Sequence, residues 1–216
     1  MRDAVEPARI GIVVYDGVEP IDIGGTVGVI SMARRVLPHL ADTVIARRPG
    51  PVRLAGGLVI EAPHGFDDAP ECDVTIVCGG PGWPEAAADP AMLAFLQRHP
   101  ARQLASVCTG ALILAAAGSL DGRAATTRRA RLGHETEAPL AILGRHARAA
   151  PARAVVDDVV VTGGGVSLAI DVTLYLIGRL YGAHARDEVA RVIEYDRALA
   201  ANTAALGIDI VAAERV

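Results

Sequence analysis

The segment from Gln103 to Gly118, QLASVCTGALILAAAG, decides the fold of this 216-residue chain. Its first five residues form an apolar run that predicts a buried strand. The Ala- and Leu-rich run from Thr109 to Ala117 predicts a helix, which Gly118 ends as a left-handed cap. Cys108 stands between the two elements. A side chain at such a strand-to-helix turn points out of the sheet, so we expect a nucleophile elbow with sulfur as the nucleophile.

Outward from this segment, predicted strands alternate with predicted helices through most of the chain. The expected strands are 10–15, 43–47 and 73–78, the expected hairpins turn at 55–57 and 157–158, and the expected helices are 26–36, 89–99, 129–143, 167–181 and 185–201. The tail 208–216 fits no element. This order predicts an α/β three-layer sandwich with a mostly parallel, doubly wound, flavodoxin-like sheet. We expect one domain over residues 1–216.

Composition excludes several classes of protein. The formal net charge of −4 disfavours nucleic acid as a partner, and we interpret the Arg-rich stretch Arg123–Arg131 as a solvated surface. No apolar run reaches about 18 residues, so we expect no membrane partner. Three cysteines are too few for a disulfide framework, and the N-terminus lacks a signal-peptide pattern. We therefore expect a cytoplasmic location.

Three loops should meet at one edge of the sheet. Ligand sites of doubly wound sheets lie outside the carboxyl ends of the strands. The loops expected there are 16–25, 79–84 and 108–110. We therefore expect any catalytic site to be built from these three segments.

Cys108 is the strongest candidate for chemistry. Unpaired N–H groups and the positive end of the following helix should favour the thiolate and lower the pKa of the thiol from about 8.5. The loop glycines Gly79 and Gly80 should bring further amides close, and the N–H groups of Gly80 and Thr109 could form an oxyanion hole beside Gly110. The alternatives are a buried structural cysteine and an ordinary tight glycine loop.

Glu19 and Asp22 are the candidate acids. A carboxyl group near a thiol can exchange protons with a bound substrate, although a solvated loop residue or a helix cap would look the same in the sequence. No histidine spacing indicates a metal site, so we expect neither metal nor cofactor. His134 is the histidine expected nearest to the site, and we read Cys72 and Cys78 as structural.

Four stretches carry a resemblance to a known family. They are IGIVVYDGVEPIDIGG (10–25), TIVCGGPG (75–82), LASVCTGALILAAAGSLDGRAATT (104–127) and VVTGGGVSLAIDVTLYLI (160–177). Together they resemble the ThiJ/PfpI superfamily, which has a class I glutamine-amidotransferase-like fold. Within it, the Ser-Val-Cys-Thr-Gly-Ala run is most similar to isonitrile hydratases and to the ligand domains of certain AraC-type regulators.

The resemblance implies roles for particular residues. It implies that Cys108 is the catalytic cysteine, that Asp22 is the loop aspartate of isonitrile hydratases, and that Thr109 follows the nucleophile as it does in them. The wider superfamily places a glutamate earlier in the loop, which falls on Glu19. A histidine after the cysteine would indicate a peptidase, and Thr109 stands there instead. The resemblance also implies a homodimer and a small-molecule substrate.

Two departures from the family pattern concern specificity. Gly24-Gly25 replaces the common Gly-Pro after the loop aspartate, and Arg128-Arg129 replaces His-Trp after two threonines. The arginines would favour an anionic substrate if they lie near the pocket mouth. The expected function is isonitrile hydration, a lyase reaction. Two alternatives stay open: a cysteine-dependent hydrolase, amidase or glyoxalase-like enzyme on another small electrophile, and a non-catalytic sensor domain related to AraC-type regulators.

Overall fold

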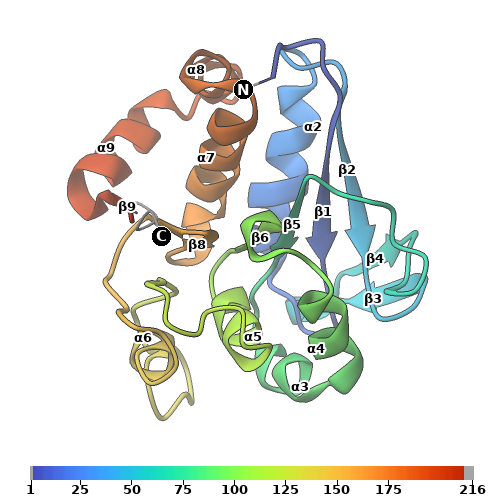
Figure 1. Ribbon diagram of the computed structural model, residues 1–216, viewed down its shortest axis with the longest axis vertical. Coiled ribbons are helices and arrows are strands. Elements are labelled where there is room, and N and C mark those ends of the chain that lie inside the picture. The colour runs from blue at the N-terminus through green and yellow to red at the C-terminus, as the bar shows by residue number, and fades with distance from the viewer. Residues whose placement is uncertain (1, 212–216) are drawn as a thin grey trace.

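A seven-stranded sheet forms the middle of the molecule in the computed structural model, which describes residues 2–211 (Figure 1). Its strand order is β2-β1-β5-β6-β8-β7-β9, and every neighbouring pair is parallel except β7 with β8. The predicted mostly parallel α/β sheet is therefore confirmed. The sheet strands are Ala8–Val13 (β1), Leu40–Ile45 (β2), Val74–Val77 (β5), Leu104–Ser106 (β6), Val155–Asp158 (β7), Val160–Gly163 (β8) and Ile208–Ile210 (β9).

A separate antiparallel pair, Gly50–Arg53 (β3) and Val59–Ala62 (β4), forms the hairpin expected around residues 55–57. The hairpin expected around 157–158 is the β7–β8 pair. The α-helices are Pro20–Ile23 (α1), Val29–Ala33 (α2), Trp83–Ala88 (α3), Pro90–Gln97 (α4), Gly110–Ala116 (α5), Pro139–Leu143 (α6), Ala169–Tyr181 (α7), Ala183–Val192 (α8) and Asp196–Leu206 (α9). A π-helical segment, Gly24–Gly28, joins α1 to α2, and 3-10 turns cover Ala55–Gly57, Ala101–Gln103 and Val166–Leu168.

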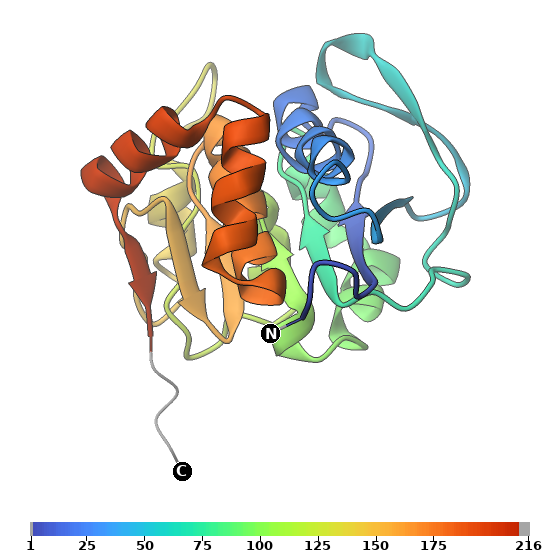
Figure 2. The same ribbon diagram turned by 90° about the horizontal axis from the view of Figure 1, so that it is seen from above.

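The helices cover both faces of the sheet. Helices α2, α7 and α8 pack in one apolar core, and α3, α4, α5 and α6 contribute to a second core on the opposite face. Figure 2 shows the blue α2 beside the orange-red α7 and α8 on one side of the sheet. All residues of β5 and β6 are buried, as apolar central strands of a parallel sheet require. The layers are those of a three-layer sandwich.

Two predicted helices were wrong. The prediction of a helix over 129–143 fails because only α6, starting with Pro139 at its first position, is helical there. Gly133 takes the left-handed conformation upstream of it, which interrupts a helix. The prediction of one helix over 185–201 fails because Glu194, with φ of 54°, separates α8 from α9.

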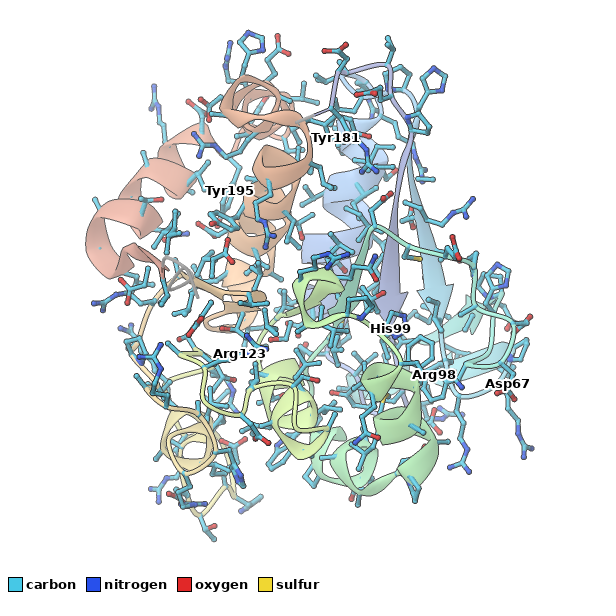
Figure 3. All side chains as sticks on the ribbon, in the orientation of Figure 1. Asp67, Arg98, His99, Arg123, Tyr181 and Tyr195 are labelled. Carbon is cyan, nitrogen blue, oxygen red and sulfur yellow. The ribbon has the colours of Figure 1, made fainter. Side chains whose placement is uncertain are left out.

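The break between α8 and α9 forms a polar contact with α7. Tyr195, labelled in Figure 3, donates its hydroxyl to Asp171 Oδ2 at 2.9 Å. Asn202 Nδ2 donates to the same carboxylate at 3.1 Å. Asp171 is 3% exposed, and a buried carboxylate needs such donors. The unassigned tail begins with β9, and residues 212–216 lie outside the described part of the chain.

Two short helices were missed near the site. The segment 16–25, expected as a loop, becomes helical at Pro20, so Asp22 lies in the first turn of α1. Helix α3 begins at Trp83, directly after the glycine loop that follows β5. Both helices are shorter than two turns, and apolar periodicity does not reveal helices of that length. No helix of the described residues has the length and apolar character to cross a bilayer.

Candidate active site

Cys108 occupies a tight turn between β6 and α5. Its φ is 50°, a left-handed conformation that a residue with a side chain adopts at a cost. The turn is held by the Thr127 hydroxyl, which donates to the Cys108 carbonyl oxygen at 2.6 Å, and by Gly110 N–H, which donates to Val107 O at 3.0 Å. This conformation is that of the expected elbow.

Two glycines allow the elbow to pack against the end of β5. A Cβ atom on Gly110 would lie 2.1 Å from the Val77 carbonyl oxygen, and one on Gly79 would lie 2.4 Å from the Thr109 nitrogen. Neither contact is physically possible for a side chain. The sequence therefore uses Gly79 and Gly110 for close backbone packing, and Gly110 N–H is already paired within the elbow.

The three expected loops do meet. Glu19 N–H donates to Gly79 O at 2.8 Å, and Gly79 N–H donates to Asp22 Oδ2 at 2.7 Å. Gly80 N–H donates to the Thr109 hydroxyl oxygen at 2.9 Å. The loop after β5 is thus tied to α1 and to the elbow, so that Asp22 and Cys108 both adjoin Gly79.

The expected oxyanion hole is not open. The Gly80 N–H expected to hold an anion is occupied by the Thr109 hydroxyl, and the neighbouring Gly79 N–H is occupied by Asp22. The Thr109 amide instead acts on Cys108, where it lowers the pKa of the thiol. The sequence could not indicate this, because the competing acceptors come from other segments of the chain.

Asp22 differs from a solvated acid in its burial and in its pKa. It is fully buried, and burial raises its pKa to about 7. The Gly79 N–H lowers this pKa, the charge of Glu19 raises it and the charge of Arg128 lowers it. Oδ2 accepts from Gly79, whereas Oδ1 is buried without a hydrogen-bond partner. A carboxyl group that titrates near neutral pH and has one unpaired oxygen is suited to proton transfer.

The expected low pKa of Cys108 is wrong. The side chain is only 3% exposed, and burial raises the pKa of the thiol to about 12. The charge of Asp22 raises it further, while the Thr109 amide and hydroxyl and the Arg128 guanidinium lower it. The following helix is only seven residues long, and its field does not outweigh burial. The resting residue is therefore a thiol.

Glu19 is placed differently from Asp22. It is half-buried and occupies the N-cap of α1, but its side chain does not cap the helix. Its backbone N–H binds the glycine loop, and its charge acts on Asp22. The effects of Glu19 are thus on the pKa of Asp22 and on the position of the glycine loop that binds Asp22.

Arg128 shows that the interpretation of Arg123–Arg131 as a solvated surface is wrong in its middle part, because residues 124–128 are buried. Its guanidinium is 9% exposed, pairs with Glu135 and donates to the Ala130 carbonyl oxygen. Its charge lowers the pKa of both Asp22 and Cys108, so it lies within electrostatic reach of the thiol. The sequence feature that pointed to Arg128 was the replacement of His-Trp in the family pattern by Arg128-Arg129.

The remaining candidates lie at the periphery. His134 is exposed and lines a cavity with Pro81 and Trp83. Cys72 and Cys78 are free thiols, and burial raises the pKa of each. Among the described residues, no group of three or more His, Cys, Asp or Glu side chains is placed to hold a metal ion.

The sheet order and the cysteine elbow define the class of protein. The chain belongs to the DJ-1/PfpI family, whose profile matches residues 8–178. Isonitrile hydratase of Pseudomonas putida is 34% identical over 87% of this chain and 78% of that protein. The transcriptional regulator GbdR of Pseudomonas aeruginosa is 29% identical over 88% of this chain, which spans 52% of the regulator.

Solved structures agree on the fold. A ThiJ/PfpI family protein from Pseudomonas syringae superposes with a TM-score of 0.75 at 30% identity, covering 89% of this chain and 76% of that one. Drosophila melanogaster DJ-1beta superposes with a TM-score of 0.72 at 16% identity, covering 88% of this chain and 98% of that one. At that identity the second likeness concerns the fold alone.

Proposed function

We propose that the protein hydrates isonitriles to N-substituted formamides, with Cys108 as nucleophile and Asp22 as the proton carrier. The observation that carries this proposal is the buried Asp22 carboxyl group, which titrates near neutral pH, keeps Oδ1 unpaired and lies within electrostatic reach of the Cys108 thiol. The likeness to isonitrile hydratase over most of the chain supports the same reaction.

In the first half of the reaction, sulfur bonds to the terminal carbon of R–N≡C. Because the resting Cys108 is a thiol, its proton must leave as the carbon–sulfur bond forms. The ionised Asp22 accepts this proton and returns it to the same carbon, which gives the thioimidate R–N=CH–S. A base beside the thiol removes the need for a resting thiolate.

In the second half, water adds to the thioimidate carbon. Asp22 takes a proton from the water and supplies one to the nitrogen, and the carbon–sulfur bond then breaks. Sulfur recovers its proton, and R–NH–CHO leaves. The sum is one isonitrile and one water giving one formamide, with no oxidant, metal or cofactor consumed.

In this proposal, Thr109 stabilises the negative charge that develops on the reacting atoms. Its amide and hydroxyl both lower the pKa of the Cys108 thiol, and the hydroxyl is oriented by Gly80, from whose N–H it accepts at 2.9 Å and to whose carbonyl oxygen it donates at 3.3 Å. Gly79 keeps its amide on Asp22 and so fixes the proton carrier. Gly110 contributes close packing of the elbow.

The limited access to Cys108 favours an isonitrile over larger electrophiles. The side chain is 3% exposed, so a planar amide with substituents on both sides has little room to reach the sulfur. An isonitrile ends in a single carbon at the tip of a linear group. Such a tip needs little exposed surface on the sulfur.

The test is turnover of a simple alkyl or aryl isonitrile, followed as the formyl proton of the formamide by NMR. We expect formamide from the wild-type protein and from Cys72→Ser, and none above background from Cys108→Ser. Absence of formamide from the wild-type protein would remove this reaction from consideration.

A sensor without turnover is the second candidate. The buried, protonated sulfur of Cys108 and the 29% identity to a transcriptional regulator favour it. Tight binding of a small molecule that survives Cys108→Ala, with no product formed, would replace the enzyme by this sensor.

We further propose that the protein works as a cytoplasmic homodimer. The three free cysteines suit a reducing compartment. Ile21 on α1 and Leu58 and Val59 beside the hairpin turn are exposed apolar side chains that a partner would cover. Light scattering after size-exclusion chromatography should give twice the chain mass, and a monomer would contradict the dimer.

A further inference from the structure

A cavity of about 420 Å³ lies beside the elbow, at the carboxyl edge of the sheet. Its walls come from residues 127–130, from the turn 164–168 after β8 and from the end of α9. Thr127 connects it to the elbow, because Thr127 lines the cavity and donates to the Cys108 backbone carbonyl oxygen at 2.6 Å, although Cys108 itself is not among the lining residues. The cavity is therefore placed to hold the part of a substrate that trails behind the reacting carbon.

The charged residues that line this cavity are all arginines, and two of them are paired with carboxylates outside the lining. The three arginines are Arg128, Arg129 and Arg153, and no carboxylate is among the lining residues. Arg128 pairs with Glu135, and Arg153 Nε donates to Asp209 at 2.9 Å. Arg129 is exposed and, unlike Arg128 and Arg153, takes part in no ion pair among the described residues. Three arginines thus line one cavity in a chain whose formal net charge is −4.

A helix start adds to this field. The turn Gly164–Leu168 contains the 3-10 segment that runs directly into α7, a helix of 13 residues. The first N–H groups of a helical segment have no partner within it, and the helix dipole is positive there. This end of the segment lies in the cavity wall. It acts in the same direction as the arginines.

Apart from the arginines and the polar Thr127, Ser167 and Asn202, the wall is apolar or made of small residues. Leu132, Val166, Leu168 and Leu206 line the cavity together with small residues. A ligand that satisfies both parts of the wall has a compact anionic group and an aliphatic side chain. The planar arginine fork matches a carboxylate in two parallel hydrogen bonds.

We propose that this cavity binds a carboxylate of the substrate, and that the protein acts on isonitriles derived from apolar α-amino acids, in which isonitrile and carboxylate share one carbon. The proposal rests on isonitrile hydration at Cys108. It assigns Arg128, Arg129 and Arg153 to substrate specificity. The short separation of the two groups matches the position of Arg128, which directly follows Thr127, the residue that donates to the Cys108 carbonyl oxygen at 2.6 Å.

The first test is binding of the stable product, because it needs no turnover. N-formyl-leucine and its methyl ester are titrated calorimetrically into the wild-type protein. We expect the acid to bind at least about tenfold tighter than the ester, and Arg129→Gln and Arg153→Gln each to weaken the acid about three- to tenfold while leaving the ester unchanged. Arg131→Gln is the matched control, since Arg131 is exposed and does not line the cavity.

Inorganic phosphate is the second arm of the same titration. We expect phosphate not to displace N-formyl-leucine at comparable concentration. Displacement by phosphate as effective as that by the acid itself would mean that the cavity recognises charge alone, which overturns the carboxylate assignment. Equal binding of acid and ester would also overturn it.

Turnover then separates this inference from the proposed function. The leucine-derived isonitrile should show a lower KM as the free carboxylate than as the methyl ester, with similar kcat. Equal KM values for the two forms contradict the carboxylate site and leave isonitrile hydration standing. Arginine-dependent binding of N-formyl-leucine without turnover of any isonitrile keeps the anion site and refutes the reaction.

Discussion

Asp22 Oδ2 accepts a hydrogen bond of 2.7 Å from the Gly79 N–H, while Oδ1 of the same carboxyl group has no partner. One oxygen is thus fixed to the loop after β5, and the other is free to carry a proton. Burial raises the pKa of this group to about 7. The protonation state of Asp22 therefore controls both the proposed reaction and the reactivity of Cys108.

The proposed base role of Asp22 predicts a pH dependence. Because the raised pKa is about 7, the carboxyl group is neutral below this pH and ionised above it. Only the ionised form accepts the thiol proton, so kcat/KM for isonitrile hydration should rise with pH to a plateau, with a midpoint near 7. Initial rates between pH 5 and 9 measure this.

The control for this profile is Asp22→Asn, which keeps an acceptor for the Gly79 N–H. It should reduce kcat by about 10²- to 10⁴-fold, the usual contribution of a positioned acid or base. A variant that retains both the rate and the rising limb would show that another group carries the proton.

Alkylation of Cys108 should respond to the charge of Asp22. Burial and then the Asp22 charge raise the pKa of the thiol to about 12, so the wild-type residue should react slowly with iodoacetamide at pH 8. Asp22→Asn removes the negative charge and should speed labelling of Cys108 several-fold. Peptide mapping after timed labelling measures the rate.

Cys72 serves as the internal control for that experiment. Burial raises its pKa to about 11, and the charges that act on it are those of Arg9 and Asp73. Its labelling rate should be the same in both proteins. Equal acceleration of Cys72 and Cys108 would mean that the substitution loosened the fold instead of changing the local charge.

Thr127 should be needed for the elbow geometry. Thr127→Val removes the donor to the Cys108 carbonyl oxygen and leaves that buried oxygen unpaired. We expect a loss of about 1–3 kcal/mol in the free energy of unfolding and a lower kcat. Urea unfolding and steady-state rates test this. Thr127→Ser keeps the hydroxyl and should stay close to wild type in both, and a valine variant equal to the serine variant would argue against this hydrogen bond.

Gly79 should tolerate no side chain. A Cβ atom there would lie 2.4 Å from the Thr109 nitrogen and 2.9 Å from the Cys108 Cβ, so Gly79→Ala must push the loop off the elbow. We expect a lower melting temperature and loss of turnover. The matched control is Gly28→Ala, whose Cβ would meet nothing within 4 Å and should stabilise the helix by up to about 1 kcal/mol. Equal melting temperatures for the two variants would contradict this account of the packing.

The elbow and the meeting of the loops could be predicted from the sequence, because both follow from local patterns. An apolar strand followed by Cys108 and an Ala-rich helix is a local signal, and parallel strands bring the loops after them to one edge. The placement of Asp22 beside Gly79 followed from this topology.

Burial could not be predicted in the same way. The pKa of Cys108 depends on how much of the chain covers the sulfur. Whether an amide is free to bind an oxyanion depends on which acceptors of the protein already occupy it, as the Thr109 hydroxyl occupies the Gly80 N–H. Both are tertiary effects, whereas the low pKa predicted for Cys108 considered only the field of the helix that follows it. The error over residues 129–143 has a similar origin, since Arg128 and Glu135 pair across a segment that a continuous helix would have ordered differently.

The most direct test of the central claim is the bond between Cys108 and the substrate. The protein is mixed with an alkyl isonitrile, quenched within one turnover and analysed by intact-mass and peptide mass spectrometry. Attack by sulfur predicts a mass increase of one isonitrile on the peptide that contains Cys108, and no adduct in Cys108→Ser. Formamide produced at the wild-type rate by Cys108→Ser, with no adduct on any cysteine, would contradict the claim.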